Sequence, residues 1–447
     1  MSTCRNSRTQ PQLHPEDTKR WSMKQTTILE SGTNAATEEE RNDFSLLRML
    51  SPQVLADPHV FYRGLRDYDP VHWDPYMHAW VVTSYSEVMS VLKNFSADRT
   101  PAPAYLDRLG LSFMKPFAEV MLKQMMFMDG ATHARLRSIC SAAFTPRKVE
   151  ELRASIATTV DELLDKHIAH GQMDMIADFA NPLPAIVTAR LLGIPTEDHE
   201  QLHAWVLDLA EVLGNFQHHP DRVCEIVQSL EDLKNYIAAR MDEQRKNPSD
   251  GLIYSLMTAE VDGARLSDDE VIANTIITLI GGHETTTNLI ASGFLTLLRN
   301  PASLEQLRGH PEIAASAVEE MLRYESPVQH TARIAPGDTE LGGKTIRKGS
   351  RVVAVLAAAN RDPSRFPDPD RLDLLRSDNR HLAFGWAAHF CFGAPLARIE
   401  CQIAFNTLLR RLSNPALIEQ KLEWRQNAGL RGLTGLNIRF SPGPAQA

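Results

Sequence analysis

The feature that most limits how this chain can fold is one long apolar stretch with helical spacing, between residues 271 and 298. Just before it, Ser267-Asp-Asp-Glu270 has the spacing of a capping box, in which serine and glutamate side chains satisfy free N–H groups of a first helical turn. Asn300-Pro301 ends the pattern, because proline cannot continue a helix. The sequence therefore predicts a helix of about 32 residues, roughly 48 Å long.

A helix of this length crosses either a membrane or the interior of a large protein. His283 and Glu284 stand near its centre, and a charged side chain there costs about 2.5–3.5 kcal/mol in a membrane span. The composition also favours a protein interior, since 43% of the 447 residues are hydrophobic and 23% are charged, as in ordinary globular proteins. A net charge of −9 without basic clusters argues against binding to nucleic acid or to a membrane surface.

The remaining sequence predicts one mostly helical domain, residues 44–447, with a few short strands. Strands are expected at 71–73, 79–83, 339–356 and 436–440, and an irregular Pro-rich lid loop at 98–116. Residues 1–43 are polar, lack the apolar run of a signal peptide, and are expected to form a disordered extension. Five scattered cysteines without CxxC spacing predict no disulfide framework, so we expect a cytoplasmic protein.

The centre of the long helix carries Gly281-Gly282-His283-Glu284-Thr285. Two glycines inside a helix cost roughly 1 kcal/mol each relative to alanine, but they leave room for something large and flat against the helix. Glu284 beside Thr285 places an acid next to an alcohol, a pair that can relay protons. A simple notch for helix packing explains the glycines equally well. The zinc pattern HExxH fails here, since position 287 is Thr.

Cys391 lies in an apolar loop that leads directly into a helix with Pro395 in its first turn. The N–H groups at a helix N-terminus stabilise a thiolate and lower the pKa of a cysteine. A single thiolate of this kind suits iron. An isolated cysteine is more often a small buried hydrophobe, so the assignment depends on the rest of the chain.

Several further charged residues are weak indicators of function one by one and become informative only as a set. Glu320 and Arg323 share one helix face, where such a pair is usually a solvated surface pair. Four other side chains could neutralise the carboxylates of a cofactor, although each alone is more often an ordinary surface cation or core histidine: His133, Arg137, Arg333 and His381.

Taken together and in this order, these motifs resemble the cytochrome P-450 family, in particular its soluble bacterial members. The resemblance extends from about residue 57 to residue 440. It rests on Met128-Asp-Gly-Ala-Thr-His133-Ala-Arg-Leu-Arg137, Ala143-Phe-Thr-Pro146, Gly281-Gly-His-Glu-Thr-Thr286, Glu320-Met-Leu-Arg323-Tyr-Glu-Ser-Pro-Val328, Ala359-Asn-Arg-Asp362, Arg365-Phe-Pro-Asp368 and the Cys391 loop.

The resemblance implies a mainly α-helical, triangular fold with small sheets, in which the long helix lies over haem b (iron protoporphyrin IX). It implies that Cys391 is the iron ligand, with Phe384 packed near the thiolate and Gly393 allowing the chain to turn beside it. Glu320 and Arg323 would form a buried supporting network. His133, Arg137, Arg333 and His381 would hold the haem propionates. Gly281 and Gly282 would make room for O2, and Glu284 and Thr285 would deliver protons to it.

One position departs from the family pattern. The family usually has glycine four residues before the cysteine, where this chain has Ala387. Alanine with positive φ costs about 1–2 kcal/mol, so we expect the loop to adopt a slightly different turn there.

The implied function is a haem-thiolate monooxygenase that inserts one oxygen atom from O2 into a C–H or C=C bond. The pocket would be formed by apolar residues, including Ile277, Val328, Ala332 and Leu433, which predicts a lipophilic substrate of the kind found in secondary metabolism. Too few residues follow Cys391 for a fused reductase, so a monomer served by a separate ferredoxin and ferredoxin reductase, and through them by NAD(P)H, is expected. Three alternatives stay open: a peroxide-driven enzyme on the same fold, a haem protein without catalysis, and a helical protein without haem.

Overall fold

The long apolar stretch forms one continuous helix, α15 (Asp268–Arg299), of 32 residues. Its N-terminus carries the predicted capping box, in which the Ser267 side chain accepts from Glu270 N and the Glu270 side chain accepts from Ser267 N. Asn300 ends it and Pro301 begins the next helix. The sequence prediction of this helix is confirmed at both ends.

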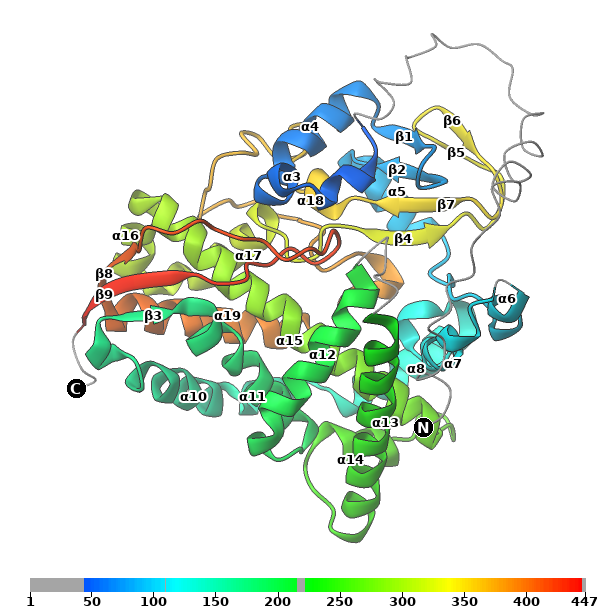
Figure 1. The fold of residues 1–447 in the computed structure, drawn as a ribbon, viewed down its shortest axis with the longest axis horizontal. Coiled ribbons are helices and arrows are strands. Elements are labelled where there is room, and N and C mark those ends of the chain that lie inside the picture. Colours follow the sequence, from blue (N-terminus) through cyan, green and yellow to red (C-terminus); the bar gives the residue numbers. More distant parts are fainter. Residues whose placement is uncertain (1–43, 109, 215–221, 444–447) are drawn as a thin grey trace, which may run out of the picture. The chain divides into compact units, whose positions relative to one another are not determined.

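The computed structural model describes residues 44–108, 110–214 and 222–443. The predicted disordered extension, residues 1–43, lies outside them. Within the described part most elements are helices, which Figure 1 labels: α3 (Pro52–Ala56), α4 (Pro58–Tyr68), α5 (Tyr85–Asn94), α6 (Pro103–Arg108), α7 (Lys115–Met121), α8 (Gly130–Ala143), α9 (Pro146–Glu151), α10 (Arg153–Asp165), α11 (Pro182–Leu192), α12 (His199–Gly214), α13 (Val223–Lys246), α14 (Leu252–Thr258), α16 (Pro301–Gly309), α17 (Ala314–Tyr324), α18 (Leu356–Ala359) and α19 (Ala394–Arg411).

The strands form three small sheets. The largest has the order β1-β2-β7-β4, with β1 (Val71–Asp74) antiparallel to β2 (Ala79–Val82), β2 parallel to β7 (Arg351–Ala354), and β7 antiparallel to β4 (Thr331–Ile334). The second has the order β3-β9-β8, with β3 (Gln172–Asp174), β9 (Asn437–Pro442) and β8 (Leu412–Leu417). The third is the hairpin of β5 (Thr339–Leu341) and β6 (Lys344–Ile346). The strands expected near 71–83, 339–356 and 436–440 are confirmed.

The helices build the main core around α15, which packs against α11, α12, α13 and α19. In Figure 1 the four-stranded sheet and the hairpin lie at one end of the view, next to α3, α4, α5 and α18. A smaller apolar cluster, which includes Val82, Val88 and Val352, joins that sheet to α5. Among the described residues, no helix is long and apolar enough to span a membrane.

One local expectation needed correction. The segment at 98–116 is not wholly irregular, because α6 and the first residues of α7 lie within it. α15 continues without a break through Gly281 and Gly282.

Candidate functional site

Cys391 ends a loop that passes directly into α19. Its backbone N–H donates to Phe384 O at 2.8 Å, which closes the loop on itself. Gly393 is the N-cap of α19, and the N–H groups of Gly393 and Ala394 bond to the Cys391 thiol. Burial raises the pKa of this thiol, and those two N–H groups with the charge of Arg137 lower it only in part. The sequence expectation of a lowered pKa is therefore wrong for the protein without a metal, although its donors are present.

Ala387 adopts the left-handed conformation that glycine would favour, with φ of 56°. The loop therefore keeps the turn of the family pattern instead of the altered turn expected from sequence. The Ala387 side chain is exposed, so the Cβ meets no obstacle. The cost is confined to the backbone conformation, about 1–2 kcal/mol.

One line of residues along α15 faces open space. Ile277, Gly281 and Thr285 follow at intervals of four, and all three are partly or fully exposed within a mostly buried stretch. A Cβ placed on Gly281 would meet no heavy atom within 4 Å. The Thr285 hydroxyl donates to Gly281 O at 2.6 Å. This face of α15 is open at the glycine and carries one hydroxyl beside the opening.

Glu284, the acid next to Thr285, contacts Arg425 and not the open face. Arg425, from the segment before β9, donates to both carboxylate oxygens of Glu284 at 2.9 and 3.0 Å, and the Asn288 amide donates to Glu284 at 3.1 Å. A Cβ on Gly432 would lie 2.0 Å from the Asn288 side chain, so only glycine lets this segment approach α15. The structure thus brings Glu284 to Arg425 and does not bond it to Thr285.

A group of basic side chains gathers beside the Cys391 loop, made of three arginines (Arg99, Arg137 and Arg333) and two histidines (His133 and His389). Burial lowers the pKa of both histidines, that of His389 to about 4, so the positive charge comes from the arginines. We refer to all five residues as the cation cluster. The His133 and His389 rings lie 4.3 Å apart, and the Arg137 guanidinium lies 5.4 Å from the Phe392 ring. Burial and the charge of Arg333 lower the pKa of Arg99 to about 9. Asp129 is the carboxylate that acts on Arg99, His133, Arg333 and His389.

His381, predicted from sequence to join this group, has other partners. Its Nε2 lies 3.2 Å from Glu319, and Glu319 also accepts from Arg398 at 2.7 and 2.8 Å. His389 and Arg99 were missed. For His389 a signal existed, because it lies two residues before Cys391 in the same loop. No local pattern pointed to Arg99, which reaches the cluster only through the fold.

Glu320 and Arg323 form a fully buried ion pair on α17, with two hydrogen bonds of 2.8 Å. Arg323 also donates to the carbonyls of Asn360, Pro369 and Arg371. Glu320 accepts in addition from the Asp373 N–H and the side chains of Arg376 and Asn379. Each charged atom of the pair has a partner, as expected of a supporting network.

The predicted pocket residues fall into two groups. Val328 and Ala332 are partly exposed, whereas Leu433 is 1% exposed and bridges to Trp424. A small apolar cavity of about 20 Å3 lies between α7, α12, α13 and α15 and is lined by Phe117, Val120, Met121, Gln124, Leu209, Val212, Leu230, Ile276 and Ile280.

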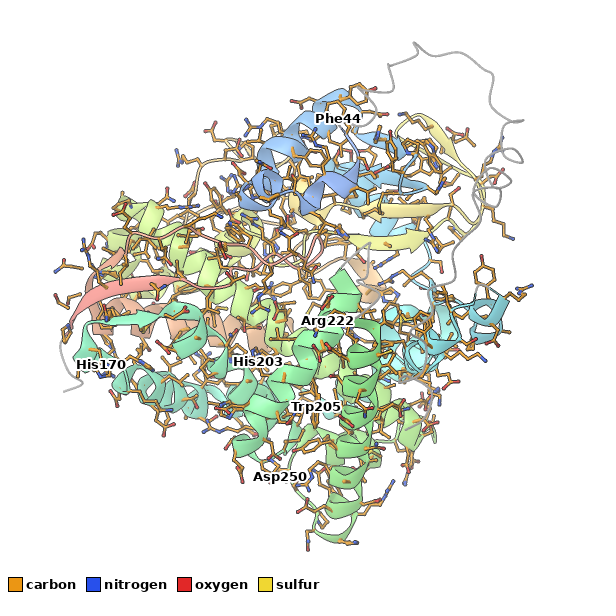
Figure 2. All side chains as sticks on the ribbon, viewed as in Figure 1. Phe44, His170, His203, Trp205, Arg222 and Asp250 are labelled. Atoms are coloured by element: carbon orange, nitrogen blue, oxygen red, sulfur yellow. The ribbon has the colours of Figure 1, made fainter. Side chains whose placement is uncertain are left out.

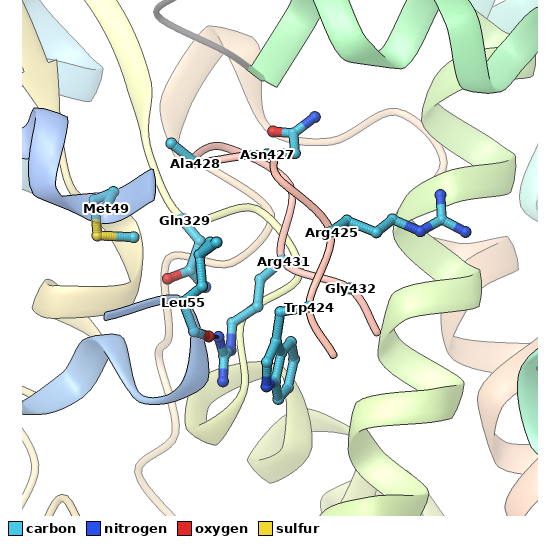
Figure 3. Close-up of a pocket in the computed structure, with 9 residues that line it drawn as sticks. All are labelled: Met49, Leu55, Gln329, Trp424, Arg425, Asn427, Ala428, Arg431 and Gly432. Carbon is cyan, nitrogen blue, oxygen red and sulfur yellow. Dashed lines mark hydrogen bonds between the residues drawn. The ribbon is translucent and has the colours of Figure 1, made fainter. Parts of the chain in front are cut away.

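A second, smaller cavity of about 10 Å3 lies beside the segment that carries Arg425. Figure 3 shows Arg431 lying against the Trp424 ring there, with 3.5 Å from the guanidinium carbon to the ring centroid. In the same view Arg425 points away from this cavity. The arrangement supports the segment on one side and leaves Arg425 free to reach Glu284 on the other.

The residues fit a haem. The Nε of Arg333 is buried without a hydrogen-bond partner, and a buried polar group of this kind requires one. A dianionic ligand would supply it and offset the excess positive charge of the cation cluster. The open face of α15 at Gly281 would receive the flat side of such a group, and Cys391 presents the soft ligand that iron takes.

The comparisons with known proteins agree. The family model described as cytochrome P450 matches residues 114–313 and 310–422. A biotin-biosynthesis cytochrome P-450 of Bacillus subtilis is 38% identical over 399 residues, which cover 87% of this chain and 98% of that protein. The cytochrome P-450 monooxygenase PikC of Streptomyces venezuelae is 36% identical over 89% of this chain and 94% of its own length.

Solved structures show the same fold. The BioI cytochrome P-450, crystallised with an acyl carrier protein ligated to hexadec-9Z-enoic acid, matches with a TM-score of 0.81 and 36% identity, over 88% of this chain and all of that one. The residues that the family model matches include α15, the Glu320–Arg323 pair and the cysteine loop. We conclude that this chain belongs to the cytochrome P-450 family of haem-thiolate enzymes and is a monooxygenase of the bacterial type.

Proposed function

We propose that residues 44–447 form one haem domain that inserts an oxygen atom from O2 into a C–H or C=C bond of a lipophilic, natural-product-like molecule. The observation that carries this is the open face of α15, where Gly281 leaves space and Thr285 stands beside it. The bound haem supplies the activation of oxygen and the bond-forming chemistry. The chain's own residues hold the cofactor, keep the pocket apolar and control protons.

Cys391 would bind the iron, with Phe384 and Gly393 shaping the loop around the sulfur. His133, Arg137, Arg333 and His389 would hold the two propionates, because they form the cation cluster next to that loop. We assign His389 in place of His381, whose ring is already bonded to Glu319. Glu320 and Arg323 would hold the coil of residues 360–380 under α17.

Thr285 would hold and pass a proton at Oγ1, which lies at the opening beside Gly281. Glu284 would act as the buried acid behind it. Its partner Arg425 keeps 22% of its side chain exposed, so it leads from the buried carboxylate toward solvent. Thr285 would therefore supply the hydroxyl at the reaction space, and Glu284 the carboxylate that connects it to solvent.

The pocket favours an apolar substrate, since Ile277, Val328 and Ala332 carry no charge and the adjoining cavity is lined almost wholly by apolar side chains. A carrier-bound acyl chain is a second candidate, favoured by the likeness to the BioI complex with an acyl carrier protein. Electrons would come from a separate ferredoxin and its reductase in the cytoplasm. Arg135, Arg376, Arg380 and Arg398 do not offer a free basic patch for them, because each is paired with a carboxylate.

Thr285→Ala tests the proposal. We expect this variant to consume NAD(P)H with less than a tenth of the wild-type yield of oxygenated product, because the proton at the opening is lost. Thr278→Ala is the matched control, since Thr278 makes the same bond to the carbonyl four residues earlier, Asn274 O at 2.7 Å. A full product yield from Thr285→Ala would contradict the role. Robust turnover with peroxide alone would favour the peroxide-driven alternative.

A further inference from the structure

Two histidines join α12 to the centre of α15. His203 Nδ1 lies 2.8 Å from His283 Nε2, and the two rings stack with centroids 4.6 Å apart at 28°. His283 is 2% exposed and directly precedes Glu284. Figure 2 labels His203 on α12, where that helix crosses the long helix. No step of the proposed reaction uses this pair.

The direction of this hydrogen bond follows from its surroundings. His283 also bonds the backbone of Asn181, and because that bond raises the pKa of His283, the acceptor is the carbonyl. With Nε2 facing His203, the donor to Asn181 is Nδ1–H. Burial lowers the pKa of His283 to about 3 and of His203 to about 4, so both rings are neutral at pH 7. A neutral ring has one N–H, and His203 must therefore donate to His283.

Within the described residues, this is the one side-chain hydrogen bond recorded between α12 and α15. The cavity of about 20 Å3 lies between them, with Leu209 and Val212 from α12 opposite Ile276 and Ile280 from α15. Apolar contact is non-directional, so it does not fix how far α12 stands from α15. Along α15, the cavity residues Ile276 and Ile280 directly precede Ile277 and Gly281 of the open face.

We propose that His203 is a positioning residue whose N–H clamps α12 to His283 on α15, and that this clamp limits how long an apolar group can extend from the reaction space into the cavity lined by Leu209, Ile276 and Ile280. The clamp itself is independent of the reaction, whereas its effect on substrate length rests on the proposed function. The substrate class it implies is a molecule with a short alkyl end.

Three variants of the haem-loaded protein separate the effect of the His203 hydrogen-bond donor from the effect of packing by its ring. His203→Phe keeps an aromatic ring but has no donor. His203→Asn loses the ring, but its amide N–H stands close to the position of Nδ1. His199→Phe is the matched control, because His199 lies one turn earlier on α12 and bonds only Thr196 O of its own segment among the contacts recorded for it.

Two measurements apply to each variant. Hydrogen exchange of the α12 amides reports the clamp, and we expect it to be about tenfold faster in His203→Phe and within twofold of wild type in His203→Asn and His199→Phe. Titration with 1-alkylimidazoles of growing chain length, followed by the Soret shift, reports the cavity. Each added CH2 raises affinity about fourfold up to a limiting length, and that limit should increase by two or more carbons in His203→Phe alone.

Unchanged exchange in His203→Phe, or exchange in His203→Asn as fast as in His203→Phe, would overturn the clamp, since the second result is that of a packing role. Faster exchange with an unchanged length limit would overturn the effect on substrate length. If the chain held no haem with an accessible iron, imidazole would give no Soret shift in the wild-type protein, and a haem protein without catalysis would show the shift but form no oxygenated product. The exchange experiment would still decide the clamp in either case.

Discussion

The Glu320–Arg323 network and the cation cluster are two groups of charged side chains that differ in one respect. In the network of Glu320 and Arg323, each charged atom is bonded to another charge, an amide or a carbonyl. In the cation cluster, Arg99 and Arg333 share Asp129, and the Nε of Arg333 has no partner. The charges of the first group are therefore satisfied within the protein, whereas the cation cluster has an excess of positive charge that an anionic ligand would offset.

The largest effect should come from breaking the complete network. Arg323→Met leaves the Glu320 carboxylate buried with only part of its partners, and we expect a loss of about 3–5 kcal/mol in the free energy of unfolding. Urea unfolding followed by circular dichroism measures it. Arg371→Met in the same coil is the control, since its side chain is 69% exposed and should change stability by about 0.5 kcal/mol or less. A loss below about 1 kcal/mol in Arg323→Met would remove the distinction between the two groups.

In the cation cluster, one substitution should affect the stability of the haem-free protein and the affinity for haem in opposite directions. Arg333→Met removes an unsatisfied buried cation, so we expect the haem-free protein to be unchanged or more stable by about 1 kcal/mol. The same change should weaken haem binding about 10- to 150-fold, the effect of one charge-assisted hydrogen bond of about 1.5–3 kcal/mol. Unfolding of haem-free protein and haem transfer to a scavenger measure the two. A large loss of stability without haem would place Arg333 with the structural residues.

Glu319 lies beside Glu320 on α17 and pairs with Arg398 and His381, which lie outside the cation cluster. Burial raises the pKa of its carboxyl, but the hydrogen bonds from Arg398 and His381 outweigh it and lower the pKa to about 2. The pKa in the unfolded chain is about 4.3, so this ion pair stabilises the fold above pH 4.3, and the effect is lost as pH falls toward 2. Glu319→Gln should cost on the order of 1–2 kcal/mol at pH 6. Its unfolding curve should meet that of the wild type near pH 2, and a difference that persisted there would contradict the assignment.

The smallest effect concerns the backbone of the Cys391 loop. Ala387→Gly relieves positive φ but adds freedom to the unfolded chain, so we expect a net gain of about 0.5–1 kcal/mol. The neighbouring Ala388 does not have positive φ, and Ala388→Gly should instead cost about 0.5–1 kcal/mol. Thermal unfolding of both variants checks the signs, and a loss in Ala387→Gly would contradict the strain at this position.

The sequence predicted what depends on local spacing. α15, its capping box and its ending at Asn300 follow from propensity and caps, and the family motifs placed Cys391 and the Glu320–Arg323 pair in order along the chain. What it could not predict are contacts between distant segments. Arg425 meets Glu284 only because Gly432 allows close approach to Asn288, and His381 is drawn to Glu319 from another helix. No periodicity or motif contains these pairings.

The direction of the Cys391 pKa shift is a second property that the sequence did not predict. The helix N-terminus at Cys391 was expected to lower the pKa of the thiol, and its N–H groups do point to the sulfur. Burial has the larger effect and raises the pKa instead. Sequence shows which donors are available, but only the folded chain shows how far water is excluded from them.

The most direct test of the account is the spectrum of the reduced, CO-treated protein in the wild type and in Cys391→Ser. Cys224→Ser is the control, since Cys224 is exposed on α13. We predict the red-shifted Soret band of thiolate-ligated haem in the wild type and in Cys224→Ser, and its absence in Cys391→Ser. A thiolate-type band that survived in Cys391→Ser would contradict the assignment of this cysteine as the iron ligand.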